Sequence, residues 1–477
     1  MPKEYLFSPG VTLRENQGNF FIESSDPLRL LRLNRAAYEL LEHLGTRSSP
    51  IQSGSSQTTE MKTDSFLDGL EKAGYIHLQG SPPETLPSIS IIVPVWNRVS
   101  ELHACVSSLA ALNYPLSRFE IIVVDDASSP PVSISLEDVH IKLAVSPVHG
   151  GAAHARNLGC RIATGEFIAF IDSDCVARSD WLRELVAYIP EPGIVGGVVN
   201  HPGETNIDRY ENVRSPLYLG RIGRRLDQGS EFTYLPTCNM LVNRELFEEI
   251  GGFDESLPIG EDVDLTWKAA LHGGRVRYVP TGAVEHHPSG GLKRFVARYF
   301  SYGTSVARLL SKYPKMRSTW RISSVKTLFY VLVISGLILW NALPILAGAV
   351  LPAIEFVRKS YSSRRLHAPV GAARIFGVVL VDYYNSFFEL CRGLSRHFSI
   401  VLLALSLLSQ TALVILLTAA AILAIREYVR LKPKVAFPIF LSLYFLEDLV
   451  YQLGLWLQCL RSRTLKPLLP SVLRPKS

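Results

Sequence analysis

Three patterns of hydrophobic and polar residues follow one another along the chain. The first alternates short apolar segments with polar ones and then gives two helix-like runs, at residues 30–44 and 66–75. The second repeats a strand of buried type followed by a helix, and the third has long runs without a charge. These patterns predict a small α+β domain over residues 1–80, a proline-containing linker over 81–87, an α/β domain over 88–315 and a helical tail over 316–477.

The α/β segment contains three apolar strand-like runs: SISIIVPVW from residue 88, FEIIVVDDAS from residue 119 and EFIAFIDSD from residue 166. Helix-like runs over residues 101–112 and 152–163 separate them, and strands alternating with helices predict a parallel, doubly wound sheet. In such a sheet, ligands bind beyond the carboxyl ends of the strands. The predicted strands end on polar residues that should share that edge: Asn97, Arg98, Asp125, Asp126, Asp172 and Asp174.

The tail is dominated by two runs without a charge, residues 327–354 and 400–425. The second run has 26 residues and would be about 39 Å long as a helix, more than the roughly 30 Å hydrocarbon core, so each run is long enough to span a bilayer. Asn341 and two prolines interrupt the first run, and a single span would place the basic residues after it outside. A re-entrant or surface-lying first segment is therefore favoured. A third run, 435–460, contains an acidic pair at 447–448 and is expected at the membrane interface or packed against protein.

Charge is unevenly distributed along the chain. Of the 49 Lys and Arg and the 43 Asp and Glu, 19 and 6 lie from Met316 onward, leaving 30 and 37, so the tail carries +13 and the body −7. A basic tail with apolar runs suits an anionic membrane surface and not nucleic acid. The six cysteines form no C-x-x-C pair, and the first residues lack the pattern of a secretory signal. We therefore expect a protein of the cell membrane with its catalytic part on the cytoplasmic side.

Two acidic motifs carry the candidate chemistry. Asp172 and Asp174 follow an apolar strand with one residue between them, so both carboxylates lie on the same side of an extended segment. Such a pair suits Mg²⁺ or Mn²⁺ shared with phosphate oxygens, although a D-x-D by itself is also common in solvated turns. Glu261 and Asp262 open a helix-like run, where acidic residues are often only helix caps. The adjacent histidines at 286–287 would, alone, be ordinary surface or core residues.

Taken in order, eight segments resemble the motifs of the family-2 inverting glycosyltransferases over about residues 88–314. They read ISIIVPVWNR, EIIVVDDAS, GGAAHARNLG, FIDSD, TCNMLV, GGFDE, GEDVDL and HH. The resemblance implies a GT-A-like fold and a nucleotide-diphosphate sugar bound at the strand ends. The residues that it places around this donor are Pro94, Val95, Asn97, Asp126, Arg156 and Asp172.

The same resemblance implies a metal ion and a catalytic base. The implied ligands of Mg²⁺ or Mn²⁺ are Asp172, Asp174 and either His286 or His287. Asp262 would be the base, and Glu261 would help to orient the acceptor. A sugar hydroxyl is a poor nucleophile until a carboxylate takes its proton, and a cation neutralises the charge that develops on the departing diphosphate. A single displacement inverts the anomeric centre, so an α-linked donor gives a β-glycoside.

Both ends of the chain narrow the resemblance. Residues 5–78, with GVTLR, LNRAAYELL and FLDGLEKAGYI, resemble the winged-helix-like peptide-recognition domain of pyrroloquinoline-quinone-type peptide chaperones. Residues 1–80 carry 8 Lys and Arg against 10 Asp and Glu, which argues against a nucleic-acid partner. The C-terminal LEDLVYQLGLWLQCLRSRTLKPLLP resembles the mycofactocin-system glycosyltransferases. These resemblances imply transfer of glucose from UDP-glucose to the peptide-derived redox cofactor mycofactocin or its precursor, with a peptide or biosynthetic partner at residues 1–80.

Two other functions fit part of the sequence. A membrane-bound family-2 enzyme that extends a surface polysaccharide or a lipid-linked sugar would share the donor chemistry and the tail, but it has no need of residues 1–80. A non-catalytic scaffold would use that first domain to bind peptide. The presence of Asp172, Asp174 and Asp262 argues against the scaffold, because a degenerate enzyme has no reason to keep all three carboxylates.

Overall fold

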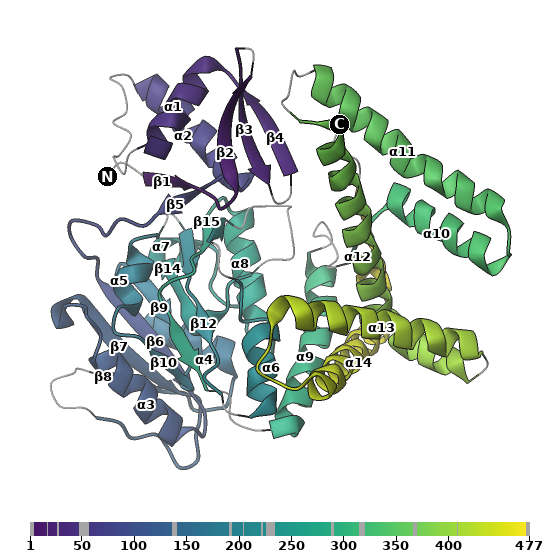
Figure 1. The fold of residues 1–477 in the computed structure, drawn as a ribbon. Helices are drawn as coiled ribbons and strands as arrows, with labels where there is room; N and C mark the ends of the chain where they lie inside the picture. Colours follow the sequence, from purple (N-terminus) through teal and green to yellow (C-terminus); the bar gives the residue numbers. More distant parts are fainter. Residues whose placement is uncertain are drawn as a thin grey trace. The chain divides into compact units, whose positions relative to one another are not determined.

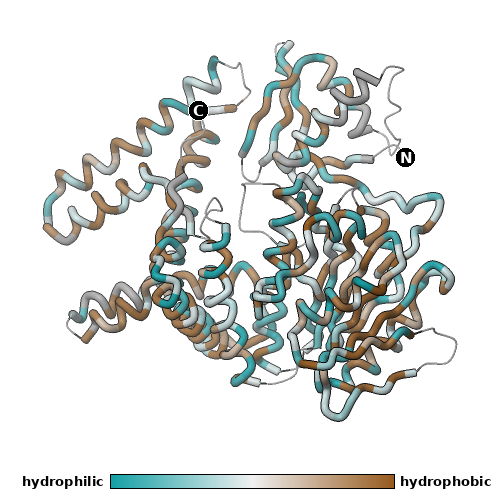
Figure 2. The backbone as a smooth tube through the Cα atoms, turned by 180° about the vertical axis from the view of Figure 1, so that it is seen from behind, coloured by the Kyte–Doolittle hydropathy of each residue, from teal (hydrophilic) through white to brown (hydrophobic). Residues whose placement is uncertain are grey.

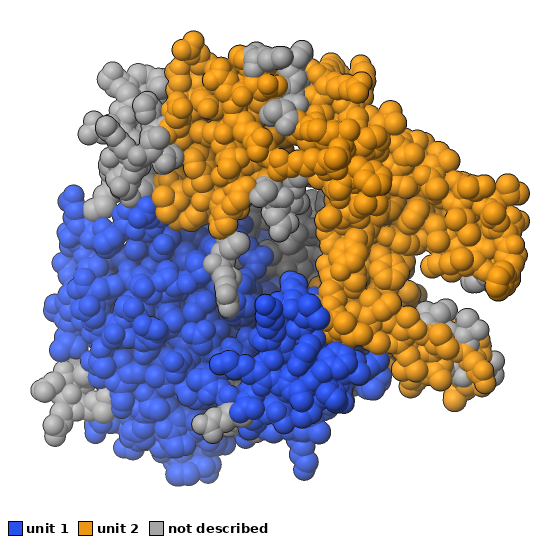
Figure 3. Space-filling view, in the orientation of Figure 1, with its two compact units in different colours: residues 1, 79–317, 427–464 blue, residues 2–78, 318–426, 465–477 orange. Residues whose placement is uncertain are grey.

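The chain forms two compact units, and each gathers segments that are far apart in sequence (Figure 3). The computed structural model describes residues 4–16, 18–25, 28–46, 57–135, 141–189, 193–203, 205–220, 223–225, 234–287, 291–313, 320–365, 370–407 and 409–473. Unit 1 contains residue 1 with residues 79–317 and 427–464. Unit 2 contains residues 2–78, 318–426 and 465–477. The chain therefore leaves unit 1 after residue 317 and returns to it at residue 427.

An eight-stranded mixed sheet forms the centre of unit 1, with strand order β13-β15-β11-β14-β9-β6-β7-β8 (Figure 1). Its strands are β6 (Ile89–Val95), β7 (Phe119–Asp125), β8 (Ile141–Val145), β9 (Phe167–Phe170), β11 (Gly193–Gly196), β13 (Arg224–Arg225), β14 (Met240–Asn243) and β15 (Arg275–Tyr278). β6 pairs in parallel with β7 and β9, and β8 pairs in parallel with β7. The three strands predicted from the sequence are thus parallel neighbours.

The expectation of a parallel sheet is wrong for the half of the sheet that contains β13, β15, β11 and β14. β14 runs antiparallel to both β9 and β11, and β13 runs antiparallel to β15. The strand–helix repeats that predicted parallel pairing end at β9. Beyond them, a four-residue strand such as β14 carries no signal of its direction, because direction depends on where the connections lead.

Helices cover both faces of this sheet. They are α3 (Val99–Ala110), α4 (Ala152–Arg161), α5 (Trp181–Val186), α7 (Arg244–Glu249) and α8 (Glu261–Leu271). Successive side chains of a strand point to opposite faces, so Ile91 packs in one apolar cluster with Leu102 of α3, and Ile92 packs in the other with Ala155 of α4 and Leu265 of α8. Burial on both faces explains why β6 reads as a continuous apolar run.

A second sheet in unit 1 has three short strands, in the order β10-β16-β12. They are β10 (Cys175–Ala177), β16 (Val284–His286) and β12 (Val199–Asn200). β10 pairs antiparallel with β16, with Cys175 opposite His286. This pairing brings the residues after β9 next to the histidine pair, although the two segments are about 110 positions apart in the sequence.

Helices α6 (Asn206–Arg214), α9 (Gly291–Lys312) and α14 (Phe437–Arg461) complete unit 1. α9 and α14 approach closely at two glycines: a Cβ on Gly303 would lie 2.0 Å from the Tyr451 carbonyl oxygen, and one on Gly454 would lie 2.0 Å from the Phe300 carbonyl oxygen. Within the described residues, α14 alone is long and apolar enough to cross a membrane, and 56% of its apolar window is buried inside the protein. The third apolar run of the tail is therefore packed against protein, one of its two expected placements.

The N-terminal part of unit 2 combines a two-stranded sheet, a three-stranded antiparallel sheet and two helices. Its elements are β1 (Glu4–Phe7), β2 (Val11–Asn16), β3 (Asn19–Ser25), β4 (Leu28–Leu33), α1 (Arg35–Thr46), α2 (Gln57–Lys72) and β5 (Ile76–Gln79). Tyr5, Ile22, Leu41, Leu67 and Ile76 share its apolar core. The helix-like run predicted from residue 30 is wrong at its start, because pairing with β3 places those residues in β4.

The rest of unit 2 corrects the picture of the two charge-free runs. Its elements are β17 (Arg321–Ser323), α10 (Ser324–Ile338), α11 (Ala342–Arg365), α12 (Ala372–Ser406), α13 (Gln410–Leu431) and β18 (Ser471–Leu473), with α13 ending in unit 1. The run 327–354 turns back after α10, and the run 400–425 is shared between α12 and α13. The 39 Å helix expected for the run 400–425 is therefore wrong, while the first run, expected to be re-entrant or surface-lying, forms two helices joined by a turn. Figure 2 shows hydrophobic residues along both α10 and α11, the two helices on either side of the turn in the first run.

Candidate active site

The segment that follows β6 shapes the first part of the site. Pro94 and Val95 are the last two residues of β6, and both are buried. Asn97 follows in a left-handed backbone conformation with φ 55°. The Asn97 N–H donates to the Ser128 hydroxyl at 2.9 Å, and its side-chain oxygen accepts from the Ser129 N–H at 2.8 Å. Asn97 thus ties the loop after β6 to the loop after β7.

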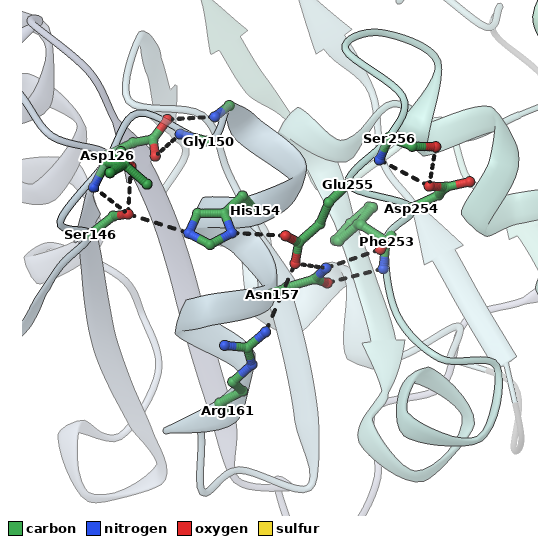
Figure 4. Close-up of polar contacts among 12 residues, drawn as sticks. Asp126, Ser146, Gly150, His154, Asn157, Arg161, Phe253, Asp254, Glu255 and Ser256 are labelled. Carbon is green, nitrogen blue, oxygen red and sulfur yellow. Dashed lines mark hydrogen bonds and ion pairs between the residues drawn. The ribbon is translucent and has the colours of Figure 1, made fainter.

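Asp126 holds the loop that precedes α4. It is 2% exposed, and its two carboxylate oxygens accept the Gly150 and Gly151 N–H groups at 2.9 and 2.8 Å. The His149 ring nitrogen lies 2.7 Å from the same carboxylate. Figure 4 shows this contact with Gly150 at the edge of a longer polar network. The carboxylate therefore acts on the site by fixing residues 149–151.

An aromatic pair beside Asp126 was missed by the sequence analysis. Trp96 is 49% exposed, and the His149 ring stacks on it with 4.1 Å between the ring centres and an 18° angle between the planes. The two residues are 53 positions apart, and neither belongs to a periodic pattern. Only the position of Trp96, directly after a strand that ends at the expected ligand edge, was available as a signal.

Arg156 joins two of the predicted motifs. One guanidinium nitrogen donates to Asp172 at 2.6 Å and another donates to Glu261 at 2.8 Å. Arg156 is 3% exposed, while Asp172 is half-buried, so part of the Asp172 carboxylate faces solvent. α4 therefore brings the aspartate after β9 together with the first residue of α8.

Asp174 lies in a separate pair with His286. Its carboxylate is contacted by Arg98 and lies 3.6 Å from Nε2 of His286. Burial and the neighbouring Asp172 raise the pKa of Asp174 to about 6, despite the positive charge of Arg98. His287 is next to His286 on an extended segment and turns the other way: its side chain is 47% exposed and lies 3.8 Å from Glu285. Of the two histidines left open by the sequence, His286 is the one beside the D-x-D.

The residues around Asp174 fit a divalent cation. Potential ligand atoms of Asp174, Cys175 and His286 lie within 4.8 Å of one another. Burial holds the pKa of the Cys175 thiol well above its usual value, so it stays protonated, and hard cations prefer oxygen ligands to sulfur. Burial is the main cause of the raised pKa of Asp174, and a bound cation would favour its ionised form. Asp174 and His286 are the fitting donors, and the half-buried Asp172 lies near enough for its charge to influence the pKa of both.

His201 supports His286 and was also missed by the sequence analysis. It follows β12, is 2% exposed, and its Nδ1 lies 3.4 Å from Nδ1 of His286. Burial lowers the pKa of His201 to about 3 and that of His286 to about 4, so both rings are neutral near pH 7. One Nδ1 must then donate to the other. If His286 is the donor, its Nε2 presents a lone pair towards Asp174.

Asp262 lies at the first turn of α8. The helix begins after Gly260, which has φ 86° and no side chain with which to cap it, so Glu261 and Asp262 are not N-caps. Burial and the adjacent Glu261 raise the pKa of Asp262 to about 8. Asp264 of the same motif is structural: it is fully buried, accepts from the Tyr313 hydroxyl at 2.7 Å and pairs with Lys312 at 2.6 Å. The motif thus divides into Glu261 and Asp262 at the site and Asp264 in the core.

The GGFDE segment is tied to α4 by the polar network of Figure 4. Asn157 exchanges two hydrogen bonds of 3.0 Å with the Phe253 backbone and donates to Glu255 at 2.8 Å. His154 bridges the Ser146 hydroxyl, at 3.3 Å, and Glu255, at 2.8 Å. This network fixes α4, which carries Arg156, and the Arg156 guanidinium lies over the Phe253 ring with 5.6 Å to its centre. The motif is therefore a positioning element.

Comparisons with known proteins agree with the geometry. The sequence profile "Glycosyl transferase family 2" matches residues 90–251. The chain is 30% identical over 400 residues to the pre-mycofactocin glycosyltransferase of Mycobacterium tuberculosis, covering 80% of this chain and 82% of the relative. It is 27% identical over 229 residues to glycosyltransferase AglE of Haloferax volcanii, covering 46% of this chain and 73% of the relative.

Two solved structures with partial similarity contain a bound nucleotide sugar. The mannosyltransferase PcManGT of Pyrobaculum calidifontis, in complex with GDP-Man and Mn²⁺, has a TM-score of 0.43 and 18% identity, and covers 79% of this chain and 90% of that one. S. aureus TarS residues 1–349 with UDP-GlcNAc has a TM-score of 0.36 and 18% identity, and covers 79% and 92%. Family assignment rests on the sequence matches and on the site residues. The chain belongs to the family-2 glycosyltransferases of the mycofactocin system, with the GT-A-like arrangement of strand-end carboxylates.

Proposed function

We propose that the protein transfers glucose from UDP-glucose to the peptide-derived redox cofactor mycofactocin or its precursor, with inversion to a β-glycoside. The observation that carries this proposal is the bridge of Arg156 between Asp172 and Glu261. It connects the predicted diphosphate side of the site to the turn that holds Asp262. A donor bound at the strand ends would then have its anomeric carbon beside a carboxylate base.

Loops after β6 and β7 would bind the nucleotide. Trp96, backed by the His149 ring, offers an exposed aromatic face on which a base can stack. Asn97 and Asp126 would shape this wall through the loops that they hold, since both side chains are already hydrogen-bonded within the protein. Pro94 and Val95 form its floor as the buried end of β6.

Asp174 and His286, with Asp172, would hold the metal ion. A divalent cation bound there would stabilise the negative charge that develops on the diphosphate. Arg156 keeps one oxygen of Asp172 occupied and leaves the rest of the carboxylate available. The neutral His286 offers a ring nitrogen without needing to lose a proton near pH 7.

Asp262 would take the proton of the acceptor hydroxyl. A base works best when its pKa is near the operating pH, and the pKa of Asp262 is raised to about 8. Glu261 is held by Arg156 at 2.8 Å, so it would orient the acceptor without moving. The reaction needs no second nucleophile, because the hydroxyl attacks the anomeric carbon directly as the bond to the diphosphate breaks.

The N-terminal part of unit 2 would bind a peptide form of the acceptor or a partner protein. β4 lies at the edge of its three-stranded sheet, where an extended peptide can add as a further strand.

The exposed apolar residues of α10 and α11 support attachment to the cell membrane. The catalytic unit would then lie on the cytoplasmic side, where nucleotide sugars are made.

The test is a transfer assay on the full chain. Purified protein in detergent is incubated with a panel of nucleotide sugars, and candidate acceptors are read by mass spectrometry. A hexose added to the mycofactocin precursor from UDP-glucose, lost on chelation, supports the proposal. Transfer only to a lipid-linked or polysaccharide acceptor would replace it with the surface-polysaccharide function. Peptide binding without any transfer would indicate a scaffold.

A further inference from the structure

The α10–α11 hairpin exposes apolar residues on its outer surfaces. Six of them, spaced three or four residues apart within each helix, are 49% to 71% exposed: Val331, Ile334, Leu337, Leu343, Leu346 and Val350. The inner surfaces pack on each other at two glycines, Gly336 against Ile345 and Gly348 against Leu332 and Val333. A helix pair that is apolar inside and outside differs from the helices of a soluble domain, which are polar on their solvent side.

Leu339 and Trp340 form the tip of the hairpin and are 67% and 97% exposed. Trp340 adopts a left-handed backbone with φ 50°, a position where glycine is usual at a helix end. Four backbone donors of the turn are nevertheless satisfied: the N–H groups of Leu339, Trp340 and Asn341 donate to carbonyl oxygens of α10, and the Asn341 side chain accepts from the Leu343 N–H at 2.9 Å. Such pairing favours placing the turn in hydrocarbon, where water cannot serve as a partner.

Charged residues stop at the base of the hairpin. Lys326 on α10 and Lys359 on α11 lie 3.8 and 2.7 Å from Asp382 of α12, and Glu355 lies 3.3 Å from Lys359. From Lys326 to Ile338 the helix rises about 18 Å, close to half of the roughly 30 Å hydrocarbon core. The hairpin is thus deep enough for one leaflet and too short to cross two.

We propose that the α10–α11 hairpin inserts into one leaflet of an anionic lipid bilayer and leaves both of its ends on the same side. The exposed Arg358, Arg364 and Arg365 lie beyond the base, where they would meet anionic headgroups. A protein groove is a poorer match than lipid, because it would have to cover both outer surfaces and the tip of the hairpin. The inference deepens the membrane attachment proposed above, but it does not depend on the transfer reaction.

Vesicle flotation of the full chain tests the insertion. Leu339→Glu with Leu343→Glu adds two charges at exposed positions of the tip, and Leu116→Glu with Leu271→Glu adds them at positions of unit 1 that are 56% and 50% exposed. With vesicles of phosphatidylcholine and phosphatidylglycerol, we expect the tip variant to bind at least tenfold more weakly and the control to bind like the parent. Equal binding by the tip variant, or a parent chain that does not float, would overturn the inference.

Depth and sidedness are tested separately. Lipids brominated on their acyl chains should quench tryptophan fluorescence of the parent, and Trp340→Phe should remove most of that quenching. A Leu339→Cys variant in intact cells should not react with a membrane-impermeant thiol reagent applied from outside. Reaction from outside would show that the hairpin crosses the membrane, which rejects the one-leaflet insertion while keeping the membrane attachment. A parent chain that does not float with vesicles but still transfers sugar would reject both attachment and insertion, and would leave the proposed reaction standing.

Discussion

Helix α14 and the α10–α11 hairpin are both apolar parts of the C-terminal third, but their surroundings are opposite. α14 carries Glu447, Asp448 and Gln452, which are 2%, 4% and 0% exposed inside unit 1. The hairpin has no charge between residues 327 and 354 and exposes its apolar side chains. Polar residues within an apolar helix mark contact with protein, because they need partners there. Apolar residues on every side mark contact with lipid.

A buried charge network explains how α14 is accommodated. Glu447 accepts from the Tyr210 hydroxyl at 2.5 Å and from Arg214 at 3.2 Å. Arg214 also lies over the Tyr444 ring, with 4.9 Å to its centre, and 3.7 Å from Glu427. Five side chains from α6, α13 and α14 thus stabilise one another in the interior of unit 1. Buried charged residues contribute to both the fold and the active site of unit 1, whereas the hairpin has charged residues only at its base.

The largest expected effect is at the active site. Asp262→Asn keeps the size of the side chain but cannot accept the proton, so turnover should fall about 10²- to 10⁴-fold with nucleotide affinity nearly unchanged. Leu339→Glu with Leu343→Glu should leave activity in detergent unchanged. Steady-state kinetics measures the turnover of both variants, and nucleotide titration measures their nucleotide affinity. Wild-type turnover in Asp262→Asn would contradict its role as the base.

The next effect concerns the fold of unit 1. Glu447→Ala leaves Arg214 buried with its nearest acceptor removed, and should lower the free energy of unfolding by about 3–5 kcal/mol. The exposed Glu248→Ala, whose partner Arg244 lies 4.0 Å away, is the control and should cost about 0–1 kcal/mol. Thermal unfolding in detergent compares them. If both variants melt alike, α14 is not held by its buried charges, and the contrast with the hairpin fails.

A smaller effect is expected at His201. His201→Phe removes the ring nitrogen that faces His286, and should weaken Mn²⁺ affinity about 10- to 100-fold. His201→Asn, which keeps a polar atom near that position, should restore most of it. Electron paramagnetic resonance titration of Mn²⁺ in the presence of UDP gives the affinity without relying on turnover. A phenylalanine variant with unchanged Mn²⁺ affinity and native melting would show that His201 is only a core residue.

The pH dependence follows from the raised pKa of Asp262. The base must be ionised, so kcat/KM should rise about tenfold per pH unit below pH 8 and level off above it. Stability has the opposite sign: the folded state keeps a proton that the unfolded state loses near pH 4, so this group destabilises the fold as pH rises from about 4 to 8. Measuring both profiles in the parent and in Asp262→Asn isolates the group. The hairpin should contribute nothing to either profile.

The smallest effect is predicted for the hairpin itself. Trp340→Gly relieves a left-handed backbone but loosens the unfolded chain, so the free energy of unfolding should change by no more than about 1 kcal/mol. Vesicle binding should nevertheless fall. Unfolding in detergent and flotation of one preparation give the two values. A large loss of stability would place Trp340 in a protein core and remove the distinction from α14.

Much of the catalytic half was predictable because its signals are local. Apolar runs of buried type predicted β6, β7 and β9, and their order in the parallel part of the sheet placed Asn97, Asp126, Asp172 and Asp174 at strand ends. The direction of β14 was not predictable, since a short strand takes its direction from distant connections. The expectation that the run 400–425 forms one helix failed, because composition does not show where one helix ends and the next begins.

From the sequence alone, composition determined the apolar, basic tail, and the resemblance of eight ordered motifs to those of the family-2 glycosyltransferases indicated the family and its two acidic motifs. Only the tertiary structure decided between His286 and His287, because adjacent residues of a strand face opposite ways and the pairing of β10 with β16 sets which one meets Asp174. The fold also decided that Arg156 joins Asp172 to Glu261, and that α14 is buried while the hairpin is exposed. These outcomes depend on contacts between residues far apart in the chain, which no local pattern encodes.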